Sequence, residues 1–173
     1  MSRPTIVQLL VLIAITCGTA TYAVAQTQAE AKAQQEYRQK ISNSMANCSV
    51  DSGPAIKVTV TGIKAGGGTL RVQSYNGNKT DWLKKGRWLS RIESEAEAGS
   101  MTFCLPVVSS GIYAVAVRHD VNGNNNTDLF EDGGAMSNDP SINIWNLGKP
   151  SYKKTAFTVR DGVEPISVKM KYW

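Results

Sequence analysis

The sequence has a single histidine, only three cysteines, and no apolar run long enough to span a membrane comfortably. A transmembrane helix needs about 20 apolar residues, and the apolar stretch from Ile6 to Ile15 is shorter and interrupted by Gln8. The sequence also lacks a Gly-x-Ser-x-Gly elbow, a phosphate-binding loop and the spacing of zinc ligands. These absences argue against most enzyme classes, so we expect a non-catalytic protein.

The first 25 residues have the pattern of a secretory signal peptide. Arg3 provides the positive charge, the apolar stretch follows, and Ala23-Val24-Ala25 offers a small-x-small cleavage site. We therefore expect cleavage after Ala25, export to the periplasm or the extracellular space, and no stable membrane span in the mature chain. An uncleaved amino-terminal anchor is the alternative.

Two cysteines remain after cleavage, Cys48 and Cys104. An even number in an exported chain predicts a disulfide, which would stabilise the fold by about 4 kcal/mol on the chain-entropy model. Free thiols and a metal pair are the alternatives. An oxidising compartment argues against the first, and the lack of a supporting ligand cluster argues against the second.

The formal net charge is +5 and becomes +4 once Arg3 is removed. A mild, scattered positive charge favours loose attraction to anionic surfaces or acidic polymers. It does not indicate nucleic acid binding, and nucleic acid is not an expected partner of an exported chain. The specific partner, an envelope protein or a glycan, does not follow from the sequence.

Residues 26–53 predict a helical or disordered spacer. Glycine and proline are absent from Gln26 to Asn47, and a thin apolar stripe runs through this segment. The stripe consists of Ala29, Ala33, Tyr37, Ile41 and Met45. A helix that binds a partner is the alternative to a spacer.

After Gly53-Pro54, apolar residues recur at every second position. Ile56, Val58 and Val60 alternate with polar residues, as in a half-buried strand. Similar segments recur along the chain with turn residues between them. About seven short strands without an internal helix predict an all-β fold over residues 54–173, an antiparallel β-sandwich of the transthyretin-like or immunoglobulin-like kind.

Residues 76–99 and 120–153 fit no strand pattern, and long excursions of this kind often carry function. The second contains oxygen-bearing side chains at positions 1, 3, 5, 7, 9 and 12 of a calcium loop: Asp120, Asn122, Asn124, Asn126, Asp128 and Glu131. Calcium bound there would be weakly held, in the ~10⁻⁴ to 10⁻³ M range of extracellular modules. The alternative is a long turn held by Asx hydrogen bonds without metal.

The first excursion contains Lys79–Arg91, with five basic residues, one acidic residue, and both Trp82 and Trp88. Exposed tryptophans beside cations suit glycan stacking or an anionic membrane surface. In the alternative interpretation, this segment is a short capped helix whose tryptophans pack inward.

A hydrolase centred on His119 and Asp120 is a further alternative. A general base needs a nucleophile or a carboxylate within reach, but neighbouring residues on a strand point to opposite faces. We therefore expect His119 to close a strand and to orient the following loop.

Several motifs stand in a familiar order: Cys48, the strand 56–62, Leu105-Pro106, Gly111-Ile112-Tyr113-Ala114, His119-Asp120 with Asn122 and Asn124, Ser137-Asn138, and Ala156-Phe157-Thr158-Val159. Together they resemble the bacterial family known as domain of unknown function 2141, over roughly residues 48–173. The resemblance implies an exported or envelope protein with a transthyretin-like sandwich, and it supplies no catalytic residue. The stretch after the asparagine-rich loop, residues 131–136, is shorter than is usual in the family.

Overall fold

The computed structural model describes residues 37–128, 130–142 and 148–172. The predicted signal peptide and the first part of the predicted spacer lie outside these ranges. The described elements follow one another as β1 (Gln39–Lys40), η1 (Met45–Cys48, a single 3₁₀ turn), β2 (Ala55–Ile63), β3 (Thr69–Asn76), β4 (Ser90–Glu95), β5 (Gly99–Pro106), β6 (Gly111–Asp120), β7 (Gly133–Met136), α2 (Tyr152–Thr155), β8 (Phe157–Val159), β9 (Val163–Lys169) and β10 (Lys171–Tyr172). No helix in these ranges is both long and apolar enough to cross a membrane.

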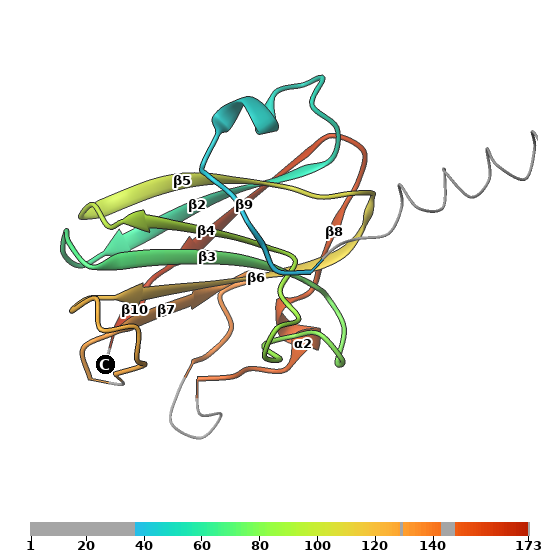
Figure 1. Ribbon diagram of the computed structural model, residues 1–173. Coiled ribbons are helices and arrows are strands. Elements are labelled where there is room, and N and C mark those ends of the chain that lie inside the picture. Colours follow the sequence, from blue (N-terminus) through green and yellow to red (C-terminus); the bar gives the residue numbers. More distant parts are fainter. Residues whose placement is uncertain (1–36, 129, 143–147, 173) are drawn as a thin grey trace, which may run out of the picture. The chain divides into compact units, whose positions relative to one another are not determined.

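The strands form two sheets that face each other (Figure 1). The larger sheet has the order β1-β4-β3-β6-β7-β10, with β8 also paired to β6, and the smaller sheet has the order β5-β2-β9. This architecture confirms the predicted all-β sandwich. The pairing is mostly antiparallel, but β2 and β9 run parallel, as do the short β1 and β4.

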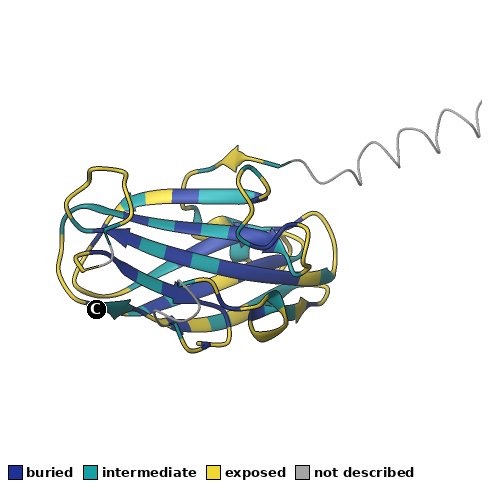
Figure 2. Cartoon of the chain, turned by 90° about the horizontal axis from the view of Figure 1, so that it is seen from below, coloured by how far each residue is buried: buried dark blue, intermediate teal, exposed yellow. Residues whose placement is uncertain are grey.

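The core lies between the sheets and consists of alternate residues of each strand (Figure 2). On β2, Ile56, Val58 and Val60 are fully buried, while Lys57 between them is exposed. Leu70 and Val72 of β3 belong to the same core from the opposite sheet. The period of two that the sequence shows is therefore the consequence of one buried face on each sheet.

Two strands lie in excursions that were predicted to contain none. On β4, Ile92 is the only buried residue, and its neighbours are polar or charged, so the alternation of apolar residues is hidden. The short β7 begins with two glycines, which provide no side chains to alternate. In addition, the predicted last strand is interrupted at Met170, where the chain passes from β9 in the smaller sheet to β10 in the larger one.

Residues 37–53 pack on the sandwich, with an extended part at β1 and a 3₁₀ turn at η1, and we call them the amino-terminal strap. The backbone N–H groups of Gln39 and Ile41 donate to the carbonyls of Leu89 and Arg91, at 2.8 and 2.9 Å. Tyr37 and Ile41 pack against the core. The prediction of a helical or disordered spacer is therefore wrong for these residues, because the edge of β4 provides the hydrogen bonds that a helix would otherwise provide.

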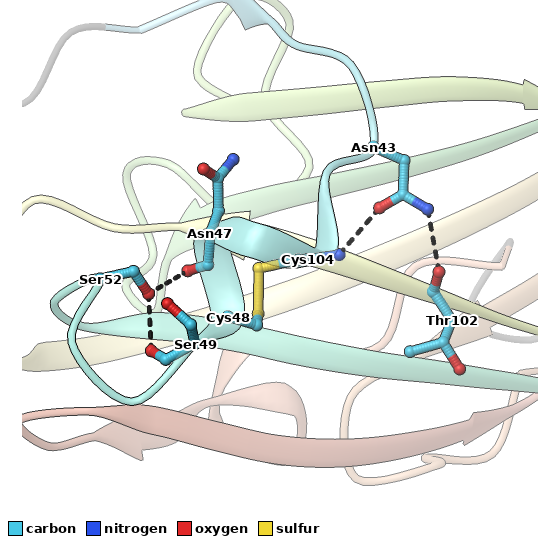
Figure 3. Close-up of a disulfide and its surroundings, with 7 residues drawn as sticks. All are labelled: Asn43, Asn47, Cys48, Ser49, Ser52, Thr102 and Cys104. Carbon is cyan, nitrogen blue, oxygen red and sulfur yellow. Dashed lines mark hydrogen bonds between the residues drawn. A yellow bond between two sulfur atoms is a disulfide. The ribbon is translucent and has the colours of Figure 1, made fainter.

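The strap is attached to β5 by the predicted disulfide, Cys48–Cys104 (Figure 3). The Asn43 side chain completes the attachment. Its amide nitrogen donates to the Thr102 carbonyl at 2.9 Å, and its oxygen accepts the Cys104 N–H at 3.1 Å. Asn43 therefore satisfies backbone groups along the edge of β5, where another strand would otherwise bind.

Candidate functional site

The outer face of the larger sheet carries a second cluster of buried apolar residues. Because Leu70 and Val72 point into the core, Arg71 and Gln73 on the same strand point outward. Segments 77–89 and 137–151 contribute side chains that pack on this outer face. The cluster contains Tyr75, Trp82, Trp88, Ala114 and Met136, with Leu83, Ala116, Ile142 and Tyr152 packed against it.

Both tryptophans of the predicted glycan surface are part of this cluster. Trp82 is 7% exposed and Trp88 is 8% exposed. The indole N–H of Trp82 donates to the Pro150 carbonyl at 2.8 Å, and its ring contacts Tyr75 edge-on. The Arg91 guanidinium lies over the Trp88 ring at 4.2 Å. Both rings therefore pack inward and are mostly covered by their neighbours, although segment 77–89 is not helical.

A hollow of about 630 Å³ lies beside the Trp88 ring, between the strap and segment 77–89. We call it the basic hollow. Its described lining residues are Arg38, Lys40, Gln73, Tyr75, Leu83, Lys84, Lys85, Gly86, Trp88 and Arg91. Half of these are cationic and none is acidic, so the hollow concentrates positive charge over an aromatic and apolar floor.

Glu93 neutralises part of this charge. Its carboxylate accepts from Arg71 at 2.7 Å and lies 3.5 Å from both Lys40 and Arg91. Burial would raise the pKa of Glu93, but the hydrogen bond from Arg71 and the nearby cations lower it below 4.5. In the described part of the chain, Lys84 and Lys85 have no carboxylate within ion-pair distance. The hollow therefore keeps an excess of positive charge.

A buried carboxylate, Asp81, holds the two walls of the basic hollow together. It accepts hydrogen bonds from Tyr37 of the strap at 2.8 Å, from Asn76 of β3 at 2.6 Å and from Arg87 at 2.7 Å. Arg87 also donates to the Tyr37 hydroxyl, and its guanidinium stacks on the Tyr37 ring. This network fixes the strap, which carries Arg38 and Lys40, against the segment that carries Lys84 and Lys85.

The ionisation of Asp81 follows from the same contacts. Burial raises the pKa of its carboxyl, but the hydrogen bonds from Asn76, Tyr37 and Arg87 outweigh burial and lower it below 3.8. Burial and the Asp81 carboxylate together raise the pKa of Tyr37 above 10.0. At neutral pH the network therefore consists of a carboxylate, a neutral phenol and a guanidinium cation.

A second hollow, of about 270 Å³, adjoins the first on the same face. Its surface is mostly apolar, with Arg71, Arg118 and Lys149 among the residues around it. Ala116 and Gly134 lie on the neighbouring strands β6 and β7 and leave room there because their side chains are small. The two hollows share Gln73 and Leu83.

The predicted calcium loop is a compact turn held by side-chain amides. The Asn122 amide donates to Asp128 at 3.1 Å and to Glu131 at 2.8 Å, while the Asn124 amide donates to Asp128 at 2.7 Å. The amides of Asn124 and Asn122 lower the pKa of Asp128. Asn126 joins this turn through its backbone N–H, which donates to the Asn124 side chain.

The first predicted ligand, Asp120, points elsewhere. One of its carboxylate oxygens accepts from Arg118 at 2.6 Å and from the Asn125 N–H at 2.8 Å. Its other oxygen is buried without a hydrogen-bond partner. Asp132, which was not among the predicted ligands, caps the backbone of Val121 and Asp128. In the described ranges, no three acidic, histidine or cysteine side chains gather as a metal cluster.

His119 is fully buried on the core side of β6. Its two ring nitrogens lie 2.9 Å from the Tyr172 hydroxyl and 2.9 Å from the Gly67 carbonyl. The structure does not bring His119 into contact with the Asp120 carboxylate, because the two side chains point to opposite faces of the strand. His119 joins β10 to the turn after β2, as a structural residue would.

Reasoning from sequence missed the basic hollow because its cations are scattered. Lys84, Lys85 and Arg91 belong to the basic segment 79–91, but Arg38 and Lys40 precede them by more than 40 residues in an apparent spacer.

Comparison with known proteins identifies the family. The chain matches the model of the family described as "Uncharacterized protein conserved in bacteria (DUF2141)" over residues 58–167. No curated protein and no solved structure matches it. The matched region covers more than half of the chain. It begins within β2, contains β3 to β8, and includes most of the residues around both hollows. The chain therefore belongs to the DUF2141 family.

Proposed function

We propose that the protein is an exported, non-catalytic module of the bacterial envelope or its surroundings, and that the basic hollow binds an acidic envelope polymer or glycan. The observation that carries the proposal is the excess of cations around an open hollow of about 630 Å³. Phosphate and carboxylate groups are the anionic groups of such polymers. Recognition by charge replaces the stacking on Trp82 and Trp88 that the sequence suggested, because both rings are buried.

The arrangement favours a bound anion in two ways. Arg91 is held rigidly by stacking on Trp88, so it loses little freedom when it pairs with a ligand. Burial and the neighbouring Arg71 lower the pKa of Arg91, and Glu93, which contacts both cations, offsets part of their repulsion. An anion in the basic hollow would be attracted by the positive charge that Glu93 leaves uncompensated.

Binding of sodium polyphosphate and of polygalacturonate tests the proposal. We expect both polymers to bind at 50 mM salt and to bind more weakly at 200 mM, since exposed charges are screened. Replacing Lys84→Glu and Lys85→Glu together should weaken binding about tenfold or more, as expected for a loss of about 1.4 kcal/mol. Isothermal titration calorimetry gives the affinities.

The matched control reverses two lysines on the outer face of the smaller sheet, Lys57→Glu and Lys169→Glu. Both are exposed, and this variant has the same net charge as the first. If both variants lost the same affinity, net charge alone would explain the loss, and this result would contradict a specific site in the basic hollow.

Calcium binding by the loop at residues 120–131 is the second candidate. The observation that favours it is the position of the Asn122 amide between the carboxylates of Asp128 and Glu131. Rotation of the Asn122 and Asn124 amides by 180° would turn their oxygens toward these carboxylates, and amide and carboxylate oxygens are ligands for calcium. The rotation would break the hydrogen bonds that the two oxygens accept from the backbone N–H groups of Asn124 and Asn126, so calcium would have to compensate for their loss. Asp120 would not take part, because it pairs with Arg118.

Thermal unfolding in chelator and in millimolar calcium tests this candidate. A ligand that binds only the folded state stabilises it by about 1.4 kcal/mol at ten times its Kd. We expect the melting temperature to rise with calcium in the unmodified protein and not in Asp128→Asn. Asp161→Asn, outside the loop, serves as the control. An unchanged melting temperature up to 10 mM calcium would leave the loop as an amide-bonded turn without metal.

A further inference from the structure

The two hollows are neighbours on the outer face of the larger sheet, and we refer to the pair as the depression. Gln73 and Leu83 line both of them, so the two spaces meet at these two side chains. Together they fall within the ~300–1,000 Å³ range of small-molecule sites. A ligand longer than one phosphate or carboxylate group could therefore occupy both at once.

The two ends of this depression differ in chemistry. The basic hollow has five cationic lining residues and no acidic one among those described. The second hollow presents a mostly apolar surface, with Leu83, Met136 and Ile142 around a floor of small residues. Its lining also includes charged residues of both signs, namely Arg71, Arg118, Lys149, Asp128 and Asp132, so it lacks the one-sided positive charge of the basic hollow. Covering apolar surface that is otherwise open to water lowers the free energy of a complex.

Leu83 lies at the junction of the two ends. Its φ is 53°, a left-handed conformation that a bulky residue rarely adopts. Strain of this kind persists only where surrounding contacts hold it and is common at ligand sites. Leu83 is held because its side chain packs against the apolar cluster, which places it between the cationic and the apolar ends.

From this juxtaposition we infer that the ligand is a single amphiphilic molecule with an acidic head group in the basic hollow and an apolar chain in the second hollow. The inference rests on the proposed function and narrows it, since it adds an apolar part to the anionic ligand. The chemistry required is that of an alkyl phosphate or an alkyl carboxylate.

Binding of octyl phosphate, below its micelle concentration, tests the inference against inorganic phosphate. We expect octyl phosphate to bind at least tenfold more tightly, as measured by isothermal titration calorimetry. The variant Lys84→Glu with Lys85→Glu should lose most of the affinity for both compounds, because both use the basic hollow.

The apolar end is tested with Gly134→Val. A Cβ added at this position would meet no atom nearer than the Val117 carbonyl oxygen at 4.0 Å, and Gly134 lines the second hollow, so we expect valine to occupy part of that hollow. We expect octyl phosphate to bind this variant no more tightly than inorganic phosphate, while polyphosphate still binds because Gly134 does not line the basic hollow. Ala116→Leu fills the same space from β6 and provides a second variant if the first unfolds.

Each outcome separates the inference from the proposed function. If polyphosphate binds but octyl phosphate is no tighter than inorganic phosphate, the amphiphile is wrong and the anion site stands. If octyl phosphate binds more tightly than inorganic phosphate and Gly134→Val and Ala116→Leu keep this difference in affinity, the octyl group binds outside the second hollow and the inference is overturned. Binding to phosphatidylglycerol vesicles without binding of monomeric octyl phosphate would overturn it in favour of a membrane surface. No binding of any anion would remove both ideas.

Discussion

Reduction of the Cys48–Cys104 disulfide is expected to lower the free energy of unfolding by about 4 kcal/mol. The bond joins residues separated by 56 positions, and the chain-entropy model assigns about that much stabilisation to a closed loop of this length. A further cost arises because Tyr37 and Ile41 of the strap pack against the core and are positioned by the same attachment. Urea unfolding followed by tryptophan fluorescence, with and without reductant, measures the change.

The double variant Cys48→Ala with Cys104→Ala is the control. It should unfold near the midpoint of the reduced protein and should not respond to reductant. Alanine is preferable to serine because Cys104 is fully buried, and a buried hydroxyl would add its own cost. Equal unfolding midpoints for the oxidised protein and the alanine variant would show that the strap is held by Asn43 and the strand contacts alone.

Replacement of Asp81→Ala is expected to destabilise the protein by about 3 kcal/mol. The substitution leaves the Tyr37 hydroxyl, the Asn76 amide and the Arg87 guanidinium without their shared acceptor. Hydrogen bonds to a charged group contribute about 1.5–3 kcal/mol each, and unpaired buried partners add a penalty, although Arg87 recovers part of this through water. Asp51→Ala is the control, because Asp51 is exposed and should change stability by no more than about 0.5 kcal/mol.

The pH dependence of stability provides a second readout for Asp81. The pKa of this carboxyl is lower in the folded protein than its ordinary value of 3.8. The folded state therefore binds fewer protons than the unfolded state near that pH, and the stabilisation is fully present above 3.8. It is lost as the pH falls from 3.8 through the folded value. In Asp81→Asn, this loss of stability at acidic pH should disappear. If the free energy of unfolding fell with decreasing pH as much in this variant as in the unmodified protein, the role assigned to the network would be contradicted.

The sequence predicted those parts of the fold in which side chains alternate visibly. One core strand, β2, was predicted from the alternation of Ile56, Val58 and Val60. The disulfide was predicted from the two cysteines that remain after the signal peptide. The strap could not be predicted, because Tyr37 and Ile41 repeat at a helical spacing and only the free edge of β4 makes the extended conformation favourable. The local pattern in this segment indicated a helix, whereas pairing with β4 in the folded protein produces an extended strand.

The candidate site was predictable only in part. Lys84, Lys85 and Arg91 of segment 79–91 line the basic hollow, but the sequence could not decide whether Trp82 and Trp88 face solvent. That depends on the outer face of the larger sheet, where Tyr75 and Pro150 provide their partners. The basic hollow is built from the strap, two strands and a loop that meet only in the folded chain, so no local sequence motif predicts it.

The parallel pairing of β2 with β9 determines when the sandwich can close. Ala55 is the partner of Val163, so the central strand of the smaller sheet stays unpaired on one side until nearly the whole chain is present. Contacts between such distant residues slow folding. The smaller sheet therefore completes its pairing only after β9, one of the last strands of the chain, has been made.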